Sequence, residues 1–185
     1  FDEVRQVAQV TVFQVLIHLV MTASLHDAAR LGRKDMINDL LNSNHSLDLN
    51  GKDDDGLTPL HAAVIENRTT CGAYLLDMGA KVNVPDREGN TALHLAASRG
   101  YQRTVSMLLW GGAERDAVNA KQETALALAA RAGEVGVVEV LLRNGADESV
   151  LMADSNGQRP VDLATEAGHQ EVVKVLQRAE PSSKL

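Results

Sequence analysis

Apolar and polar positions repeat along most of this 185-residue chain at an interval of 33 residues. Each interval holds a short alanine-rich segment and then a longer aliphatic segment, with polar stretches between them. Several residue types keep the interval together: Thr58, Thr91 and Thr124; Ala63, Ala96 and Ala129; the leucine pairs at 75–76, 108–109 and 141–142; and Gly79, Gly112 and Gly145. This recurrence indicates a repeat architecture, in which units stack because no unit can bury its own apolar face.

Each unit predicts two helices joined by a sharp turn. The first helix carries two adjacent alanines, whose small side chains let neighbouring helices approach closely, and the second carries an aliphatic ridge. The turn between them predicts left-handed backbone, which glycine adopts without steric cost. Glycine stands there at Gly32, Gly100, Gly133 and Gly168, and Asn67 fills the same place in one unit. Asparagine is the next most tolerant residue for this conformation.

The stretch KDDDGLTPLHAA, residues 52–63, has two interpretations when taken alone. Three aspartates followed by glycine suggest a calcium loop, but an EF-hand loop also needs a glutamate at its twelfth position. In the two frames available that position is Pro59 or Val64, so the spacing excludes an EF-hand site. Thr58 instead predicts a helix cap, with Pro59 as the first helical residue.

The repeat divides the chain into residues 1–23, an array of about five units over 24–180, and a polar tail at 181–185. Residues 1–23 have two interpretations: a helix that caps the first unit, or the second helix of a partial unit. In the second case the connection at 18–24 is too short for a turn loop. We favour an omitted loop there, which a long distance between neighbouring Cα atoms would reveal.

Composition and charge narrow the classes of partner. Hydrophobic residues make up 44% of the chain but aromatic residues only 3%, so the core is aliphatic. The net charge of −7 argues against direct binding to nucleic acid or to an anionic membrane, because both attract a basic surface. The single cysteine, Cys71, favours a reducing, intracellular compartment. The chain begins with Phe1, so we expect a fragment of a longer protein. We also expect it to be monomeric in isolation.

The sequence contains no pattern that indicates catalysis, a cofactor or a metal. No pair of His or Cys has zinc spacing, and no Ser-His-Asp group, phosphate loop or paired-carboxylate motif is present. We interpret Cys71 as a core residue of a second helix. Trp110, at the end of another second helix, is either an exposed binding residue or packed on the outer face. We favour packing.

The units resemble the ankyrin repeat, with its pattern of a turn, TPLH and LLxxGAdvN, over residues 24–178. The resemblance implies an all-α repeat solenoid of stacked helix-turn-helix units with β-turn fingers, and a protein-binding module without catalysis. It also implies that His61 and His94 form hydrogen bonds at the start of the first helix. The sequence departs from the pattern at four positions: Gln122 replaces a turn glycine, Ala127 and Asp162 replace the histidine, and Arg159 replaces the capping threonine. Gln122 should cost about 1 kcal/mol if it is left-handed.

The resemblance places the protein-binding surface on the fingers and on the outer side of the first helices. Carried over by position, the predicted contact residues are Asp54, Asp55, Leu57, Ile65 and Glu66; Arg87, Glu88, Asn90, Ser98 and Arg99; Lys121, Glu123 and Arg131; and Asn156, Gln158 and Glu166. These side chains vary while the scaffold repeats, which suits recognition, and the alternative is ordinary variable surface. Asn83, in LLDMGAKVN, resembles ankyrin sites of asparaginyl hydroxylation; we favour the alternative, a structural asparagine.

Residues 114–133 and 158–177, together with VFQVLI near the start, are also similar to the intracellular ankyrin domain of Notch-type receptors. That similarity implies assembly of a transcription complex on a DNA-bound factor with a helical coactivator. Inhibition of a kinase or of a transcription factor, and plain scaffolding, stay open as alternatives.

Overall fold

The computed structural model describes residues 24–43 and 47–180, and the α-helices in these ranges form five consecutive pairs. The pairs are α2 (Leu25–Leu31) with α3 (Lys34–Ser43), α4 (Pro59–Ile65) with α5 (Thr69–Asp77), α6 (Ala92–Ser98) with α7 (Gln102–Trp110), α8 (Ala125–Ala132) with α9 (Val135–Arg143), and α10 (Pro160–Glu166) with α11 (Gln170–Ala179). A 3₁₀ turn, η1 (Glu148–Val150), precedes the last pair. These ranges contain no β-strand, and the predicted all-α repeat solenoid is confirmed.

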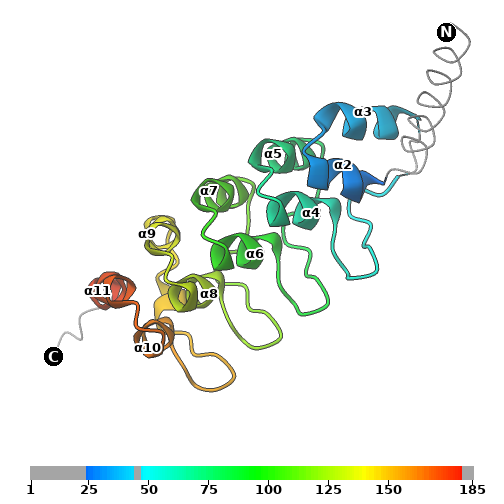
Figure 1. Ribbon diagram of the computed structural model, residues 1–185. Helices are drawn as coiled ribbons and strands as arrows, with labels where there is room; N and C mark the ends of the chain where they lie inside the picture. The colour runs from blue at the N-terminus through cyan, green and yellow to red at the C-terminus, as the bar shows by residue number, and fades with distance from the viewer. Residues whose placement is uncertain (1–23, 44–46, 181–185) are drawn as a thin grey trace, which may run out of the picture.

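The helices form two layers, and the loops between units project from one side of them (Figure 1). The first helices α2, α4, α6, α8 and α10 pack one on the next. The second helices α5, α7, α9 and α11 do the same in the other layer. The projecting loops lead into the first helices, so we call them fingers. The repeat therefore places successive fingers side by side along one edge of the molecule.

Small side chains allow the close stacking of the first helices. Ala62, Ala63, Ala96 and Ala97 have no exposed surface, and the adjacent pair at 129–130 is equally buried. The second helices contribute larger aliphatic side chains, such as Leu75 and Leu108 in α5 and α7, which are fully buried. The core thus consists of two aliphatic clusters between the two rows of helices, one over α2 to α5 and a larger one over α4 to α11, as the composition indicated.

The predicted core position of Cys71 is also confirmed, because its side chain has no exposed surface. Burial raises the pKa of the Cys71 thiol above its ordinary value. A thiol with a raised pKa forms little of the reactive thiolate at neutral pH.

Threonine and histidine together start two of the first helices. Nδ1 of His61 accepts a hydrogen bond from the Thr58 N–H at 3.1 Å and lies 2.8 Å from Thr58 Oγ1. His94 and Thr91 repeat this arrangement at 3.2 and 2.9 Å. With Nδ1 as acceptor the proton lies on Nε2, and Nε2 of His94 donates to the carbonyl of Glu123 in the next unit at 3.1 Å. The histidines expected to support these helix starts therefore do so.

Left-handed residues occur where the pattern predicted them. Gly32, Gly100, Gly133 and Gly168 end their first helices with φ between 72° and 80°, and Asn67 takes their place at φ 52°. Gln122 is left-handed at φ 59°. The conformational cost of about 1 kcal/mol, expected for Gln122 if it is left-handed, therefore applies. A helix that ends in this conformation can reverse direction within one or two residues. The turn makes room for the second helix to pack back on the first.

The prediction that Trp110 packs on the outer face is wrong, because its side chain is 90% exposed. The helix α7 buries Val105 and Leu108. Residue 110 follows Leu108 by two positions, which is about 200° around an α-helix. Trp110 therefore points away from the ridge that buries Leu108.

The predictions for residues 1–23 and 181–185 lie outside the described residues. The capping helix, the partial unit, the omitted loop at 18–24 and the polar tail all stay predictions.

Burial of the two histidines predicts a loss of stability in mildly acidic solution. Burial lowers the pKa of His61 and of His94 below the ordinary value of 6.5, so the unfolded chain binds more protons than the folded chain in this range. The free energy of unfolding should fall as the pH drops from about 7.5 to about 5.5. Urea unfolding at the two pH values measures the difference.

The variant His94→Ala carries the residue that stands at 127 in the fourth unit. It should be less stable at neutral pH but should lose less stability on acidification. A pH dependence as steep as that of the wild type would show that His94 is not the titrating group.

Candidate functional site

Four fingers close in the same way, through an Asp or Asn that stands five residues before the helix cap. These residues are Asp53, Asp86, Asn119 and Asp154. In each case Oδ1 accepts hydrogen bonds from the N–H groups two and four residues further on, at 2.8–3.0 Å. The backbone N–H of the same residue donates to the carbonyl four residues on, at 2.9–3.1 Å. Each finger is therefore a closed, hydrogen-bonded loop.

The three aspartates at 53–55 have different roles, because only Asp53 closes the finger. Asp53 is partly buried, which raises its pKa, but hydrogen bonds from the N–H groups of Leu57 and Asp55 outweigh burial and lower the pKa below its ordinary value. Asp54 and Asp55 are exposed at the tip of the finger. The stretch that suggested a calcium loop is a turn whose first carboxylate is already occupied by backbone donors.

Bonds between neighbouring fingers join them into one edge. The N–H of Ala120 donates to the carbonyl of Glu88, and the N–H of Ser155 donates to the carbonyl of Lys121, both at 2.9 Å. Between the first two fingers, Lys52 Nζ donates to the carbonyl of Pro85 at 2.6 Å. These bonds hold each finger at a fixed place relative to the next.

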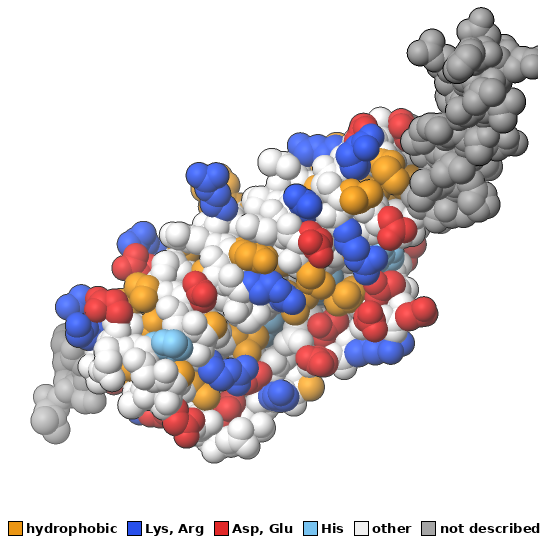
Figure 2. Space-filling model, viewed as in Figure 1, with side chains coloured by type: hydrophobic (Ala, Val, Ile, Leu, Met, Phe, Trp, Pro, Cys, Tyr) orange, Lys and Arg blue, Asp and Glu red, His pale blue; other side chains and the backbone are white. Residues whose placement is uncertain are grey.

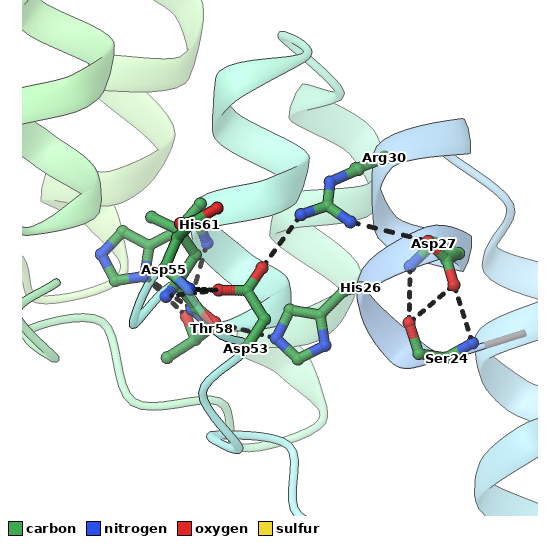
Figure 3. A network of polar contacts seen from close by, with 9 residues as sticks. Ser24, His26, Asp27, Arg30, Asp53, Asp55, Thr58 and His61 are labelled. Atoms are coloured by element: carbon green, nitrogen blue, oxygen red, sulfur yellow. Dashed lines mark hydrogen bonds and ion pairs between the residues drawn. The ribbon is translucent and has the colours of Figure 1, made fainter.

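A polar network fixes the first finger to α2 (Figure 3). His26 Nε2 lies 2.8 Å from the carbonyl oxygen of Leu57, and Arg30 donates to Asp53 Oδ2 at 2.9 Å. Arg30 also lies 3.5 Å from Asp27, which caps the start of α2 together with Ser24. The first helix of the array thus supports the finger of the following unit, as His94 of α6 does through its bond to the Glu123 carbonyl.

Most of the predicted contact residues lie on one face, formed by the fingers and the adjoining ends of the first helices. Figure 2 shows acidic side chains along the finger edge of this face. The exposed residues are Asp54, Asp55, Glu66, Arg87, Glu88, Arg99, Lys121, Arg131, Asn156 and Glu166, and the half-buried ones are Leu57, Ile65, Ser98 and Gln158. We call these residues together the finger face.

Two predicted contact residues do not belong to the finger face, because their side chains are buried between or within the fingers. Asn90 is 8% exposed and Glu123 is 3% exposed. Asn119 Nδ2 donates to Asn90 Oδ1 at 3.0 Å and to Glu123 Oε2 at 2.9 Å, and Arg131 forms an ion pair with Glu123. Their side chains serve the scaffold of the fingers and not its outer surface, which corrects the expectation from the sequence.

The residues that close the fingers are not among the site residues predicted from the sequence, although the sequence holds a signal for them. Asp53, Asp86 and Asn119 keep the interval of 33 residues, and Asp154 follows after the two-residue insertion. Asp and Asn commonly bond the backbone two residues further on in turns of this kind. A search for Asp or Asn at the repeat interval would have found all four.

Asn83 lies at the base of a finger and joins it to the next unit. Its Oδ1 accepts from the N–H of Glu114 at 2.9 Å, and its Nδ2 donates to the carbonyl of Gly112 at 3.2 Å. Asn50 makes the matching bond one unit earlier, to the N–H of Lys81 at 2.7 Å. These bonds account for a structural asparagine at 83, while modification of Asn83 stays a prediction.

In the part of the chain that the structure describes, no group of three or more His, Cys, Asp or Glu side chains could hold a metal ion. No helix within residues 24–43 and 47–180 is long and apolar enough to cross a membrane.

Comparison with known protein families gives one matching family. A family model described as ankyrin repeats (3 copies) matches residues 25–116 and again residues 103–184. The two matches together span the described array. No curated protein matches the chain.

Alanine substitutions at two finger glycines test the close approach of neighbouring fingers. Both substitutions strain the backbone, but only one of them would also create a steric contact with the next finger. Gly89 and Gly157 have nearly the same φ, 80° and 78°, so alanine at either should cost roughly 1–2 kcal/mol for its left-handed backbone. A Cβ at Gly89 would also lie 2.7 Å from the Ala120 nitrogen, whereas a Cβ at Gly157 meets nothing within 4 Å. Gly89→Ala should therefore destabilise the protein by about 1 kcal/mol more than Gly157→Ala in urea unfolding. Equal losses would contradict the contact between the fingers.

Proposed function

The chain belongs to the ankyrin-repeat family, and from this premise we propose that its finger face binds a protein partner. Ankyrin repeats are generally protein–protein interaction modules. The observation that carries the proposal is the contrast between a repeated, cross-bonded finger scaffold and the different exposed side chains that it presents in each unit. A preformed surface of this kind loses little conformational entropy when it binds.

The charges of the finger face indicate the charge distribution that a complementary partner would have. Asp54, Asp55 and Glu66 make the second unit acidic, whereas Arg87 and Arg99 add positive charge in the third. We expect a partner with a basic segment opposite the second unit and acidic groups opposite the two arginines. Such complementarity raises the association rate and fixes the register of the two proteins.

As a finer proposal, the finger face assembles a transcription-regulatory complex, as in Notch-type receptors. The support is the similarity of residues 114–133 and 158–177 to that ankyrin domain. Inhibition of a kinase or of a transcription factor, or scaffolding, would use the same face with another partner. Each of these roles is non-catalytic, and the single buried cysteine supports an intracellular site of action.

Removing the two arginines of the third unit should weaken binding without weakening the fold. Arg87 and Arg99 are exposed, and among the described residues the Arg99 guanidinium donates only to the carbonyl of Leu95 in its own helix, at 3.0 Å. The double variant Arg87→Ala, Arg99→Ala should bind the partner at least about tenfold more weakly. The partner is first isolated with the wild-type chain as bait, and its dissociation constant is then measured with purified proteins.

The matched control removes two arginines from the outer layer. Arg143 and Arg178 lie on α9 and α11 and are exposed, so the double variant Arg143→Ala, Arg178→Ala changes the net charge equally. It should bind as the wild type does, and both double variants should keep the wild-type melting temperature. An unchanged dissociation constant for the Arg87 and Arg99 variant would count against the finger face.

Hydroxylation of Asn83 is a separate proposal, supported by the similarity of LLDMGAKVN to modified ankyrin sites. Mass spectrometry of the protein from oxygenated cells should find one added oxygen on Asn83. Asn50 makes the matching hydrogen bond and serves as the internal control, which should stay unmodified. Consistent absence of the added oxygen on Asn83 would end the proposal.

A further inference from the structure

The outer layer carries an exposed apolar feature that the finger face does not explain. Trp110, the single tryptophan of the chain, is the last residue of α7 and is 90% exposed. It stands beside a hollow between α5 and α7, which lie next to each other in the outer row (Figure 1). The hollow has a volume of about 410 Å³, and its other apolar lining comes from Ala73, Leu76 and Met107. This volume lies in the range of about 300–1,000 Å³ that is usual for binding pockets.

Opposite charges lie at the hollow and beside it: Asp77 lines the hollow, and Arg103 lies outside its lining, further along α7. Asp77 lines the hollow beside Trp110 and is the last residue of α5, while Arg103 lies in the first turn of α7. Arg103, Met107 and Trp110 follow one another at helical spacing on one ridge, so Arg103 lies about 10 Å along the axis from Trp110. The basic charge therefore lies near the end of the hollow opposite Asp77.

Both charges are in unfavourable places within this chain. Negative charge is disfavoured at a helix C-terminus and positive charge at a helix N-terminus, which are the positions of Asp77 and Arg103. Neither residue forms an ion pair with another of the described residues. An external surface with the opposite order of charges would stabilise both.

We propose that this surface is the interface of a homodimer. A second copy related by a two-fold axis presents the same surface in reverse order, so that each interaction occurs twice. Trp110 of each copy enters the hollow of the other, and Asp77 faces Arg103 of the partner subunit. Tryptophan and arginine are the residues most enriched at the energetic centres of protein interfaces.

The interface is small, and its affinity is correspondingly low. A tryptophan buries roughly 150–250 Å², so two of them with their surroundings stay below the size of a standard stable interface. We expect a dissociation constant on the order of 10–100 μM. This state replaces the monomer expected from the sequence. Because the hollow lies in the layer of second helices, the dimer leaves both finger faces open (Figure 1).

Sedimentation velocity from about 1 μM to about 1 mM tests the proposal, with tryptophan fluorescence as a second measure. The wild-type chain should shift from monomer to dimer with concentration, and its emission should move to shorter wavelength over the same range. The single tryptophan makes this shift a direct measure of the burial of residue 110. Trp110→Ala should stay monomeric by sedimentation, whereas Leu151→Ala, a change at an exposed leucine elsewhere, should dimerise normally.

A charge exchange tests the geometry. Asp77→Arg and Arg103→Asp should each weaken the dimer at least about tenfold, because each places like charges opposite each other. The double variant restores opposite charges and should restore the dimer. Each single change relieves an unfavourable helix-end charge, so melting temperatures should stay equal or rise, and a loss of dimer cannot be attributed to unfolding.

Three results would overturn the proposal. One is a wild-type chain that stays monomeric at about 1 mM, which would leave the hollow to a different protein. The others are self-association that survives Trp110→Ala, and a double charge variant that stays as weak as the single variants.

Discussion

The stacking of alanine-lined helices determines where every unit and every finger of the molecule lies. Each first helix is too short to be stable alone, since isolated helices of fewer than about 12 residues are marginal in water. It gains stability by packing on its neighbours through faces such as Ala62–Ala63 and Ala96–Ala97, which are fully buried. Because alanine is small and the helices start at equivalent capped residues, every unit sits on the last in nearly the same way. The spacing and direction of the fingers follow from that repetition.

The fingers turn this repetition into a surface. A side-chain oxygen of Asp or Asn closes each one, a left-handed residue completes the turn, and bonds such as Ala120 N–H to the Glu88 carbonyl join neighbours. Backbone groups and the side chains that face the next finger are occupied in this way. The remaining side chains, such as Asp54, Arg87 and Lys121, are left to vary. Within each finger, one set of residues thus maintains the loop and another set is exposed for binding. The layer of second helices takes no part in this surface and is available for a different contact.

The interval of 33 residues was sufficient to predict the helices, their caps and the left-handed turns, because each depends on local backbone chemistry. Asn67 is the clearest case, since its position in the repeat predicted an uncommon conformation for a residue other than glycine, and Gln122, whose conformation was left open, is left-handed as well. The burial of polar side chains in the fingers could not be predicted in the same way. Asn90 and Glu123 occupy variable positions, yet Asn119 bonds both, Asn90 across to the second finger and Glu123 within the third. The exposure of Trp110 follows from its position two residues after the buried Leu108, a helical spacing that the prediction of packing did not take into account.

The central claim is that the finger face exists, already formed, in the unbound chain. Hydrogen exchange of backbone amides tests it directly, because the N–H groups of Leu57, Asn90, Glu123 and Gln158 donate to the side chains that close the fingers. If the fingers are locked to the stack, these amides should exchange within about tenfold of the rate of the buried amides in α6 and α8. Exchange at the rate of an unstructured peptide, while the helices stay protected, would show fingers that form only on binding and would contradict the account.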